Sequence, residues 1–261
     1  MDSPCAHRRP PEPELNAAPT DQLRLLDLQA LDTRLDQLAH RRRTLPEHAE
    51  AERLDTRLRQ LRDLVVAAET ERGDVEREQA KADADVEQVR QRAARDQQRL
   101  DSGAVSSPRE LESLQHELTS LARRQSSLED VELEIMERLE AVEKRLAELR
   151  AERDAVSAER DTVVARRDGA LAQIDDEAAT TRDLRGTLDG QIDAALVALY
   201  EKIRQQQDGV GAAALYQRRC QGCRLELNTT DLNRIRDAAE DEVLRCEECR
   251  RILIRTPESG L

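Results

Sequence analysis

Two short stretches near the C-terminus, Cys220-Gln221-Gly222-Cys223 and Cys246-Glu247-Glu248-Cys249, decide how this chain is interpreted. Each stretch holds two cysteines separated by two residues, so the pair of stretches places four thiolates within reach of one tetrahedral zinc ion. Zinc binds thiolates strongly enough to fold a segment that is too small to form its own core. We therefore expect one structural zinc ion, with Cys220, Cys223, Cys246 and Cys249 as its ligands.

The residues around the two cysteine pairs predict a small α+β domain over residues 209–256. Segment 211–218 is expected to form a strand that leads to Cys220, and segment 252–254, Ile-Leu-Ile, is expected to form another strand after the second pair. Zinc ribbons present their thiolates in such turns after strands. The sequence therefore predicts a C4 zinc ribbon, followed by a short tail at 257–261.

The composition of the rest of the chain favours long helices over a globular core. Charged residues make up 37% of the sequence, Phe and Trp are absent, and Tyr occurs twice. A globular core normally uses aromatic side chains for bulk, whereas a long helical seam does not need them. A net charge of −13 also fits a disordered chain. The regular heptads described next exclude disorder for most of the sequence.

Apolar and small residues recur at alternating spacings of four and three in a helix expected at 46–101. The same pattern recurs from Leu111 to Ile174 in a helix expected at about 107–207. Heptads sustained over this length are typical of a coiled coil. A shorter helix is expected at about 21–43, and Pro46 then interrupts the helical hydrogen bonding. The whole segment 20–208 is thus predicted to be helical.

The two long seams match each other as an antiparallel hairpin. The residue numbers of paired positions add to 210 or 211, which sets Val75 opposite Ile135 and Val65 opposite Leu146. The first helix extends the pairing beyond a kink near Pro46. The predicted fold class is therefore mainly α, a long kinked antiparallel coiled-coil hairpin with a small C-terminal α+β zinc ribbon.

The N-terminal residues 1–19 are rich in proline and are predicted to be disordered. Cys5 lies in this tail, matches no partner spacing and is interpreted as incidental. The sequence has no run of about 18 apolar residues and no apolar stretch of a signal peptide. A cytoplasmic protein with reduced cysteines is the expected class, which favours a metal site over disulfides.

The candidate chemistry is that of binding and not of catalysis. The sequence contains no Ser-His-Asp arrangement, phosphate-binding loop or His-Glu-x-x-His motif, and four cysteine ligands leave a zinc ion no open position. We therefore expect no enzyme activity, no small-molecule substrate and no membrane partner. A protein partner is expected to dock on the coiled coil.

Six arginines flank the two cysteine pairs and are expected to gather around the metal. They are Arg218, Arg219, Arg224, Arg250, Arg251 and Arg255. One interpretation is a patch that contacts the phosphates of a nucleic acid. The other is a solubilising surface balanced by Glu226, Glu247 and Glu248, since residues 209–261 hold nine Arg and nine acidic residues.

The chain resembles the bacterial C4-type zinc ribbon proteins that carry a long N-terminal coiled coil, a family described as nucleic-acid-binding. The resemblance rests on Ser106–Glu112, Gln125–Glu137 and the two cysteine pairs with the residues after them. It implies a kinked helical hairpin, one zinc ion and a role in binding, in some relatives linked to transcriptional or flagellar regulation. Arg250 stands where such knuckles usually carry Gly, so the second knuckle is expected to be less regular.

The sequence is compatible with two functions. In the first, the ribbon contacts nucleic acid and the coil docks a protein, such as a component of the transcription machinery. In the second, the whole molecule is a protein–protein scaffold or chaperone-like adaptor, and its zinc is purely structural. A salt-dependent nucleic-acid affinity separates them, because phosphate contacts release counterions.

Overall fold

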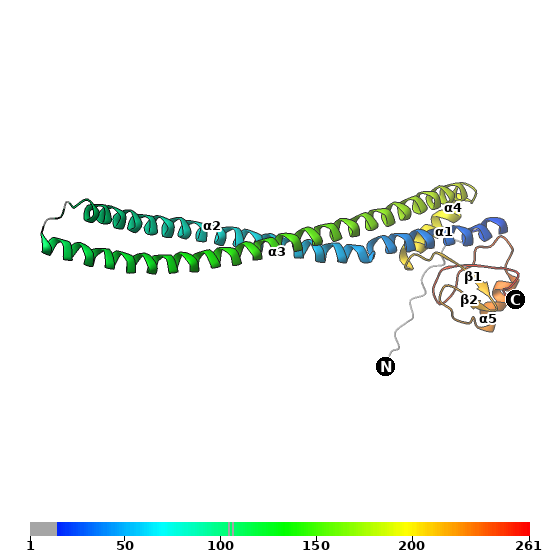
Figure 1. Ribbon diagram of the computed structural model, residues 1–261. Helices are drawn as coiled ribbons and strands as arrows, with labels where there is room; N and C mark the ends of the chain where they lie inside the picture. The colour runs from blue at the N-terminus through cyan, green and yellow to red at the C-terminus, as the bar shows by residue number, and fades with distance from the viewer. Residues whose placement is uncertain (1–14, 104, 106) are drawn as a thin grey trace, which may run out of the picture. The chain divides into compact units, whose positions relative to one another are not determined.

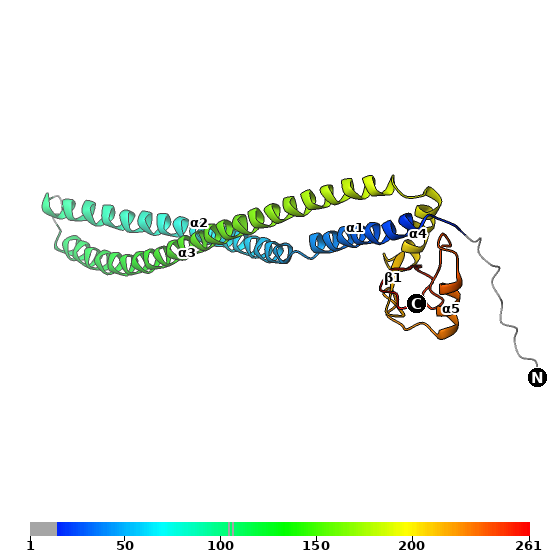
Figure 2. The same cartoon turned by 90° about the vertical axis from the view of Figure 1, so that its right-hand side faces the viewer.

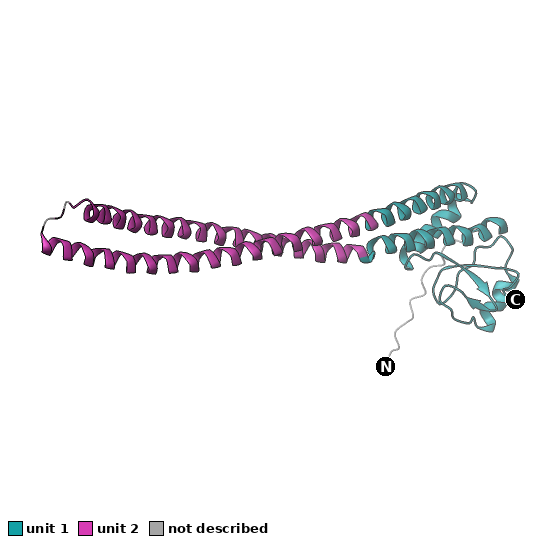
Figure 3. Cartoon of the chain, viewed as in Figure 1, with its two compact units in different colours: residues 1–46, 167–261 teal, residues 47–166 magenta. Residues whose placement is uncertain are grey.

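The computed structural model describes residues 15–103, 105 and 107–261 (Figure 1). Cys5 and the first 14 residues of the predicted tail lie outside these residues. In chain order the elements are α1 Pro19–Arg43, α2 Pro46–Asp101, α3 Pro108–Asp189, α4 Ala194–Gln206, β1 Ala212–Tyr216, β2 Arg219–Cys220, α5 Thr229–Asp237 and β3 Ile252–Ile254. The chain divides into two compact units, residues 1–46 with 167–261 and residues 47–166 (Figure 3).

The unit formed by residues 47–166 is the antiparallel hairpin of α2 with the first part of α3 (Figure 3). Val75 packs with Ile135 in one buried cluster, and Val65 packs with Leu146 in another. The register predicted from the seams is therefore confirmed. The heptad pattern determines this register because it brings the apolar seam positions of the two helices together.

Ion pairs flank this seam on its solvent side. Arg57 pairs with Glu152 at 2.5 Å, and Arg150 pairs with Glu69 at 2.6 Å, all four side chains being about half exposed. An exposed pair of this kind stabilises a fold by at most about 1 kcal/mol. The buried seam therefore provides most of the hairpin's stability, and the charges assist its register.

In the other unit, α1 lies along the C-terminal part of α3 (Figure 1). Leu38 and Ile174 are buried in one cluster, with Leu35 and Leu171 against it. Arg34 pairs with Glu177 across the same two helices. The predicted extension of the pairing by the first helix is thus present.

The predicted single helix over 107–207 is wrong at its C-terminal end. α3 ends at Asp189, and α4 begins at Ala194 and folds back against α1 (Figure 2). The Asp193 side chain caps α4 by accepting hydrogen bonds from the N–H groups of Ala195 and Leu196. A cap of this kind starts a new helix, and the reversal lets α4 bury Tyr200 completely.

The C-terminal sheet has the strand order β2-β1-β3, with β1 antiparallel to β2 and parallel to β3. β1 and β3 contribute Ala212, Ile252 and Ile254 to a core that also contains Leu25 and Leu28 of α1. The ribbon therefore shares its core with the helices. Gly211 is required here, because a Cβ at this position would lie 2.7 Å from the Tyr200 ring.

Both ends of the described chain are fastened to the ribbon. The Ala17 N–H donates to the Asp241 carbonyl and the Val243 N–H to the Leu15 carbonyl, so the prediction of disorder up to residue 19 is wrong for residues 15–19. Ser259 is buried and donates its hydroxyl to the Leu215 carbonyl. The segment predicted as a tail after residue 256 is thus an integral part of the small domain.

None of the helices in the described residues combines the length and apolarity that a membrane span needs.

Candidate metal centre and arginine edge

The four cysteines predicted as ligands come together at one point of the ribbon. Their sulfur atoms all lie within 4.8 Å of one another, with 3.9 Å between Cys220 and Cys249 and 3.9 Å between Cys223 and Cys246. A zinc ion with Zn–S bonds of about 2.3 Å separates its tetrahedral sulfur ligands by about 3.8 Å. The donor set and its spacing therefore fit one zinc ion, closed to further ligands.

The two turns that carry the cysteines have the same backbone. We call residues 220–224 the first knuckle and residues 246–250 the second knuckle. In the first, the Arg224 N–H donates to the Cys220 carbonyl at 2.7 Å, and in the second the Arg250 N–H donates to the Cys246 carbonyl at 2.9 Å. Both arginines have a positive φ, 64° and 60°. The expectation of a less regular second knuckle is wrong, since Arg250 adopts the conformation that glycine usually supplies.

Backbone N–H groups approach cysteine sulfurs in both knuckles, and that of Leu225 approaches the Cys223 sulfur. The N–H groups of Gly222 and Cys223 approach the Cys220 sulfur, and those of Glu248 and Cys249 approach the Cys246 sulfur. Without a metal, the hydrogen bond with Cys246 lowers the pKa of Cys220 and correspondingly raises the pKa of Cys246. A bound zinc would remove this competition because it holds all four sulfurs as thiolates.

A small apolar core lies beneath the metal centre. Cys220 and Cys246 are buried with Leu215, Leu232 and Leu253, whereas Cys223 and Cys249 are only partly buried. This core is too small to hold the ribbon together alone, which is the physical reason for a structural metal.

Two of the six predicted arginines are committed to the fold. Arg251 donates from Nε to the Val210 carbonyl and from Nη2 to the Gln207 carbonyl, both at 3.0 Å. Arg255 donates to the carbonyls of Ile235 and Ala238, near the end of α5. These guanidinium groups cap helix ends, so their hydrogen-bonding capacity is largely used within the protein.

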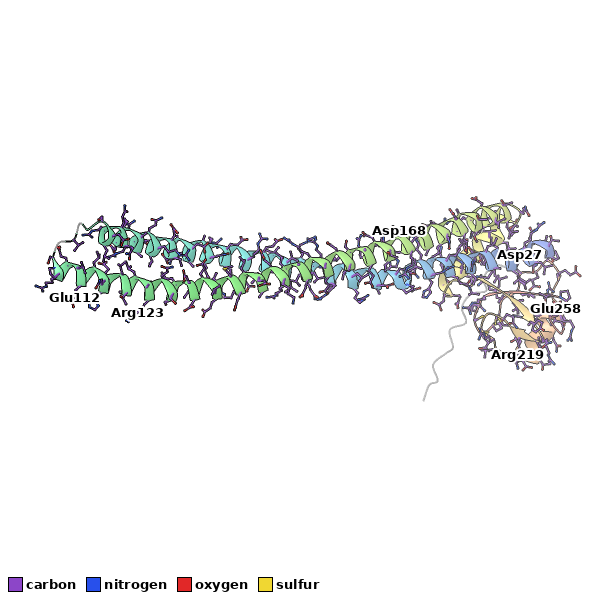
Figure 4. The ribbon with its side chains drawn as sticks, in the orientation of Figure 1. Asp27, Glu112, Arg123, Asp168, Arg219 and Glu258 are labelled. Atoms are coloured by element: carbon purple, nitrogen blue, oxygen red, sulfur yellow. The ribbon has the colours of Figure 1, made fainter. Side chains whose placement is uncertain are left out.

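The other four arginines are exposed, and they divide by knuckle. Arg250 pairs with Glu247 of its own knuckle. Arg218, Arg219 and Arg224 surround the first knuckle, and we call these three residues the arginine edge. The guanidinium of Arg219, which is labelled in Figure 4, lies 3.8 Å from the Glu226 carboxylate. The exposed side chains of Arg218 and Arg224 have no partner within the described part of the chain.

The backbone of the arginine edge is strained. Gln217 and Arg218 form the two-residue turn between β1 and β2, with φ values of 46° and 67°. Turns with this geometry prefer Asn-Gly, because a side chain in the left-handed region costs about 1 kcal/mol or more. Arg224 is held in the same region. Two exposed arginines thus stand where glycine would be more stable.

Comparisons with known proteins match each of the two parts of this chain, the helical hairpin and the ribbon, to a domain family. The CT398-like coiled coil hairpin domain family matches residues 28–208, and the C4-type zinc ribbon domain family matches residues 219–253. The chain belongs to the CT398-like coiled-coil hairpin family. An uncharacterized protein of Mycobacterium tuberculosis is 37% identical over 92% of this chain and 98% of its own length.

Two solved structures have the same fold as this chain. A structure from Mycobacterium smegmatis, 35% identical, superposes with a TM-score of 0.80 over 92% of this chain and 100% of its own. CT398 from Chlamydia trachomatis superposes with a TM-score of 0.64 over 91% of this chain and 98% of its own, at 18% identity. The latter likeness concerns the fold alone.

This family member also contains a buried polar cluster that sequence reasoning missed. The Gln29 side chain accepts a hydrogen bond from the Gly211 N–H at 2.7 Å and donates one to the Gly209 carbonyl at 3.0 Å. Asp32, 2% exposed, accepts from the Tyr200 hydroxyl and from Arg185. Burial, reinforced by the Asp32 hydrogen bond, raises the pKa of Tyr200 and keeps the phenol neutral. The cluster fixes the start of the ribbon on α1.

Proposed function

We propose that this protein is a non-enzymatic adaptor whose zinc ribbon binds the phosphate backbone of a nucleic acid through the arginine edge. The observation that carries this proposal is that Arg218 and Arg224 are exposed, without partners among the described residues, and held in left-handed backbone conformations. Backbone strain at an exposed side chain without a partner motivates a functional hypothesis for that side chain. Arginine offers phosphates a planar, bidentate donor.

Charge alone does not favour such binding, since the net charge is −13. Local arrangement supports it instead. In the second knuckle, Glu247 is engaged internally, because it pairs with Arg234 at 2.7 Å and also with Arg250. At the arginine edge, Glu226 is paired, weakly, with Arg219. A local excess of positive charge can therefore attract phosphate on an acidic chain.

The closed zinc site supports a structural role for the metal. Catalytic zinc ions keep one coordination position for water or substrate, and four cysteines leave none. We assign the zinc to folding the ribbon, and the adaptor role to the surfaces of the ribbon and the hairpin, with regulation of transcription as the setting.

The hairpin is the proposed docking surface for a protein. Leu133 and Met136 of α3 are 58% and 45% exposed, and Val66 of α2 is 55% exposed. Leu133 and Met136 lie three residues apart and so share one face of the helix. Capture of a protein partner by the zinc-loaded chain, lost in a Leu133→Ser and Met136→Ser variant, would support this part of the proposal.

The decisive experiment is a salt titration of nucleic-acid affinity. The variant Arg218→Gly, Arg219→Ala, Arg224→Gly removes the arginine edge and relieves strain at two positions, so the ribbon should be at least as stable as in the wild type. Three lost phosphate contacts should flatten the plot of log K against log salt by roughly 2–3 units. The measurement is fluorescence anisotropy with labelled single- and double-stranded oligonucleotides.

A matched control removes the same charge elsewhere. Arg62, Arg95 and Arg123 are exposed on the hairpin, and replacing all three by Ala should leave the salt slope unchanged. If the wild type binds neither probe at low salt, or if the edge variant keeps the wild-type affinity and slope, nucleic-acid binding is refuted. The protein–protein scaffold would then be the function that the exposed hairpin residues support.

A further inference from the structure

An exposed aromatic ring lies beside the arginine edge. Tyr216 is the last residue of β1 and is 44% exposed. Its cross-strand partner in β2 is Arg219, and Arg219 in turn bridges to Glu226 on its other side. Directly opposed residues of antiparallel strands project from the same face. The Tyr216 ring and the Arg219 guanidinium therefore stand in one row, directly beside the strained turn that carries Arg218.

The position of this ring is unusual within the molecule. The sequence has two tyrosines and no Phe or Trp. Tyr200 is fully buried and its hydroxyl donates to Asp32, so its role in the fold is evident. Tyr216 contributes to neither buried cluster of the ribbon. The one exposed aromatic side chain of the protein thus lies among the arginines that are available to phosphate.

We propose that Tyr216 is a base-stacking platform and that the arginine edge takes single-stranded nucleic acid in preference to duplex. This inference rests on the proposed function and adds the class of ligand. An aromatic ring on the surface of a β-strand can stack on a base only where the base is unpaired and its face is open. Arg218, Arg219 and Arg224 would hold the phosphates on either side of such a base, which fixes the strand but gives little sequence preference.

The test compares Tyr216→Ala, Tyr216→Phe and the wild type as full-length, zinc-loaded chains, with oligo(dT) and a duplex of equal length as probes. Loss of one stacked base should weaken oligo(dT) binding by roughly 5- to 150-fold in Tyr216→Ala. The slope against log salt should stay the same, because no phosphate contact is removed. Tyr216→Phe keeps the ring and should bind like the wild type.

Tyrosine fluorescence gives a second readout. With Trp absent and Tyr200 buried, the solvent-accessible emission comes from Tyr216, and stacking on a base should quench it. The same titration with oligo(U) distinguishes RNA from DNA as the source of the strand, since the ring stacks on both and only RNA offers a 2′-hydroxyl. One zinc per chain and an unchanged helical circular-dichroism signal verify the fold of each variant.

The outcomes separate this inference from the function on which it rests. If the wild type binds with a salt slope and Tyr216→Ala binds oligo(dT) equally well, the stacking platform is refuted while phosphate binding stands. An equal loss for oligo(dT) and duplex also refutes it, since the ring would then act on the fold of the edge. If the wild type binds neither probe, both the platform and the proposed function fail.

Discussion

The first knuckle, residues 220–224, and the second, residues 246–250, close with the same N–H to carbonyl hydrogen bond and the same left-handed arginine. The side chains of the knuckles other than the cysteines differ. The first has Gln221 and Gly222 between its cysteines, and the second has Glu247 and Glu248. Glu247 pairs with Arg234 and Arg250, so this carboxylate of the second knuckle is neutralised within the ribbon, whereas Glu248 is exposed.

The residues that follow the knuckles extend this difference. Arg251, after the second knuckle, ties the metal centre to the end of α4 through two carbonyls. Leu225, after the first, is 51% exposed beside the arginine edge. Gly222 packs against Arg251, since a Cβ there would lie 2.7 Å from the Arg251 Cδ. A shared backbone thus serves two purposes: the second knuckle anchors the ribbon, and the first presents its surface.

The largest expected effect is the loss of zinc, and it should be the same whichever knuckle loses a cysteine. Cys223→Ser and Cys249→Ser each remove one of four ligands, and each should lose the zinc and unfold the ribbon while the helical signal of the hairpin persists. Metal content by elemental analysis and circular dichroism are the measurements. Full zinc content in either variant would show that its knuckle is not needed for the metal, and the assignment of four ligands would be wrong.

A smaller effect, on the free energy of unfolding, should differ between arginines that follow the two knuckles. Arg251→Ala removes two hydrogen bonds from a guanidinium to backbone carbonyls and should lower the free energy of unfolding by about 1–3 kcal/mol. Arg224→Ala removes no such bond and should change stability by less than about 0.5 kcal/mol. Thermal unfolding of the zinc-loaded proteins checks both. Equal destabilisation by the two substitutions would remove the distinction between an anchoring and a presenting knuckle.

The two knuckles illustrate which features a sequence can predict and which it cannot. The spacing of residues in the sequence predicts which backbone segments lie together. Two Cys-x-x-Cys pairs bring the knuckles together, and the alternating seams set Val75 against Ile135. Spacing does not fix side-chain directions. Arg251 and Arg224 look alike in the sequence, yet Arg251 caps a helix while Arg224 is exposed. Only the tertiary position of α4 decides this difference.

The fold-back of α4 was missed for a similar reason. Apolar residues continue at helical spacing through the turn, from Leu188 to Ile192 and Leu196, and Gly190 by itself is tolerated in a helix. What favours the turn is tertiary, namely the burial of Tyr200 against Asp32 and Gln29. The pairing of residues 15–17 with 241–243 uses backbone hydrogen bonds, and the buried Gln22 side chain supports it by donating to the carbonyls of Ala17 and Glu240. A glutamine within a helix does not by itself indicate such a contact in the sequence.

A charge exchange tests whether the first knuckle's surface depends on its lack of carboxylates. Gln221→Glu gives the first knuckle the acidic residue that the second has at Glu247. Gln221 is exposed, so the ribbon should keep its stability, while the added negative charge should weaken binding of an oligonucleotide roughly 2- to 5-fold at low salt. Anisotropy at two salt concentrations measures this. An effect that persists undiminished at high salt would point to a changed backbone instead.

The smallest expected effect concerns the single carboxylate in the row of Tyr216 and Arg219. Glu226 lies 3.8 Å from the Arg219 guanidinium, and both side chains are about 60% exposed, so the pair adds little to stability. A phosphate must nevertheless compete with this carboxylate for Arg219. Glu226→Gln should therefore tighten oligonucleotide binding about twofold at low salt, with the gain disappearing as salt screens the pair. Glu248→Gln, which removes a carboxylate from the second knuckle, is the matched control and should change affinity less. If Glu248→Gln has the larger effect, the binding surface belongs to the second knuckle, and the roles assigned to the two turns must be exchanged.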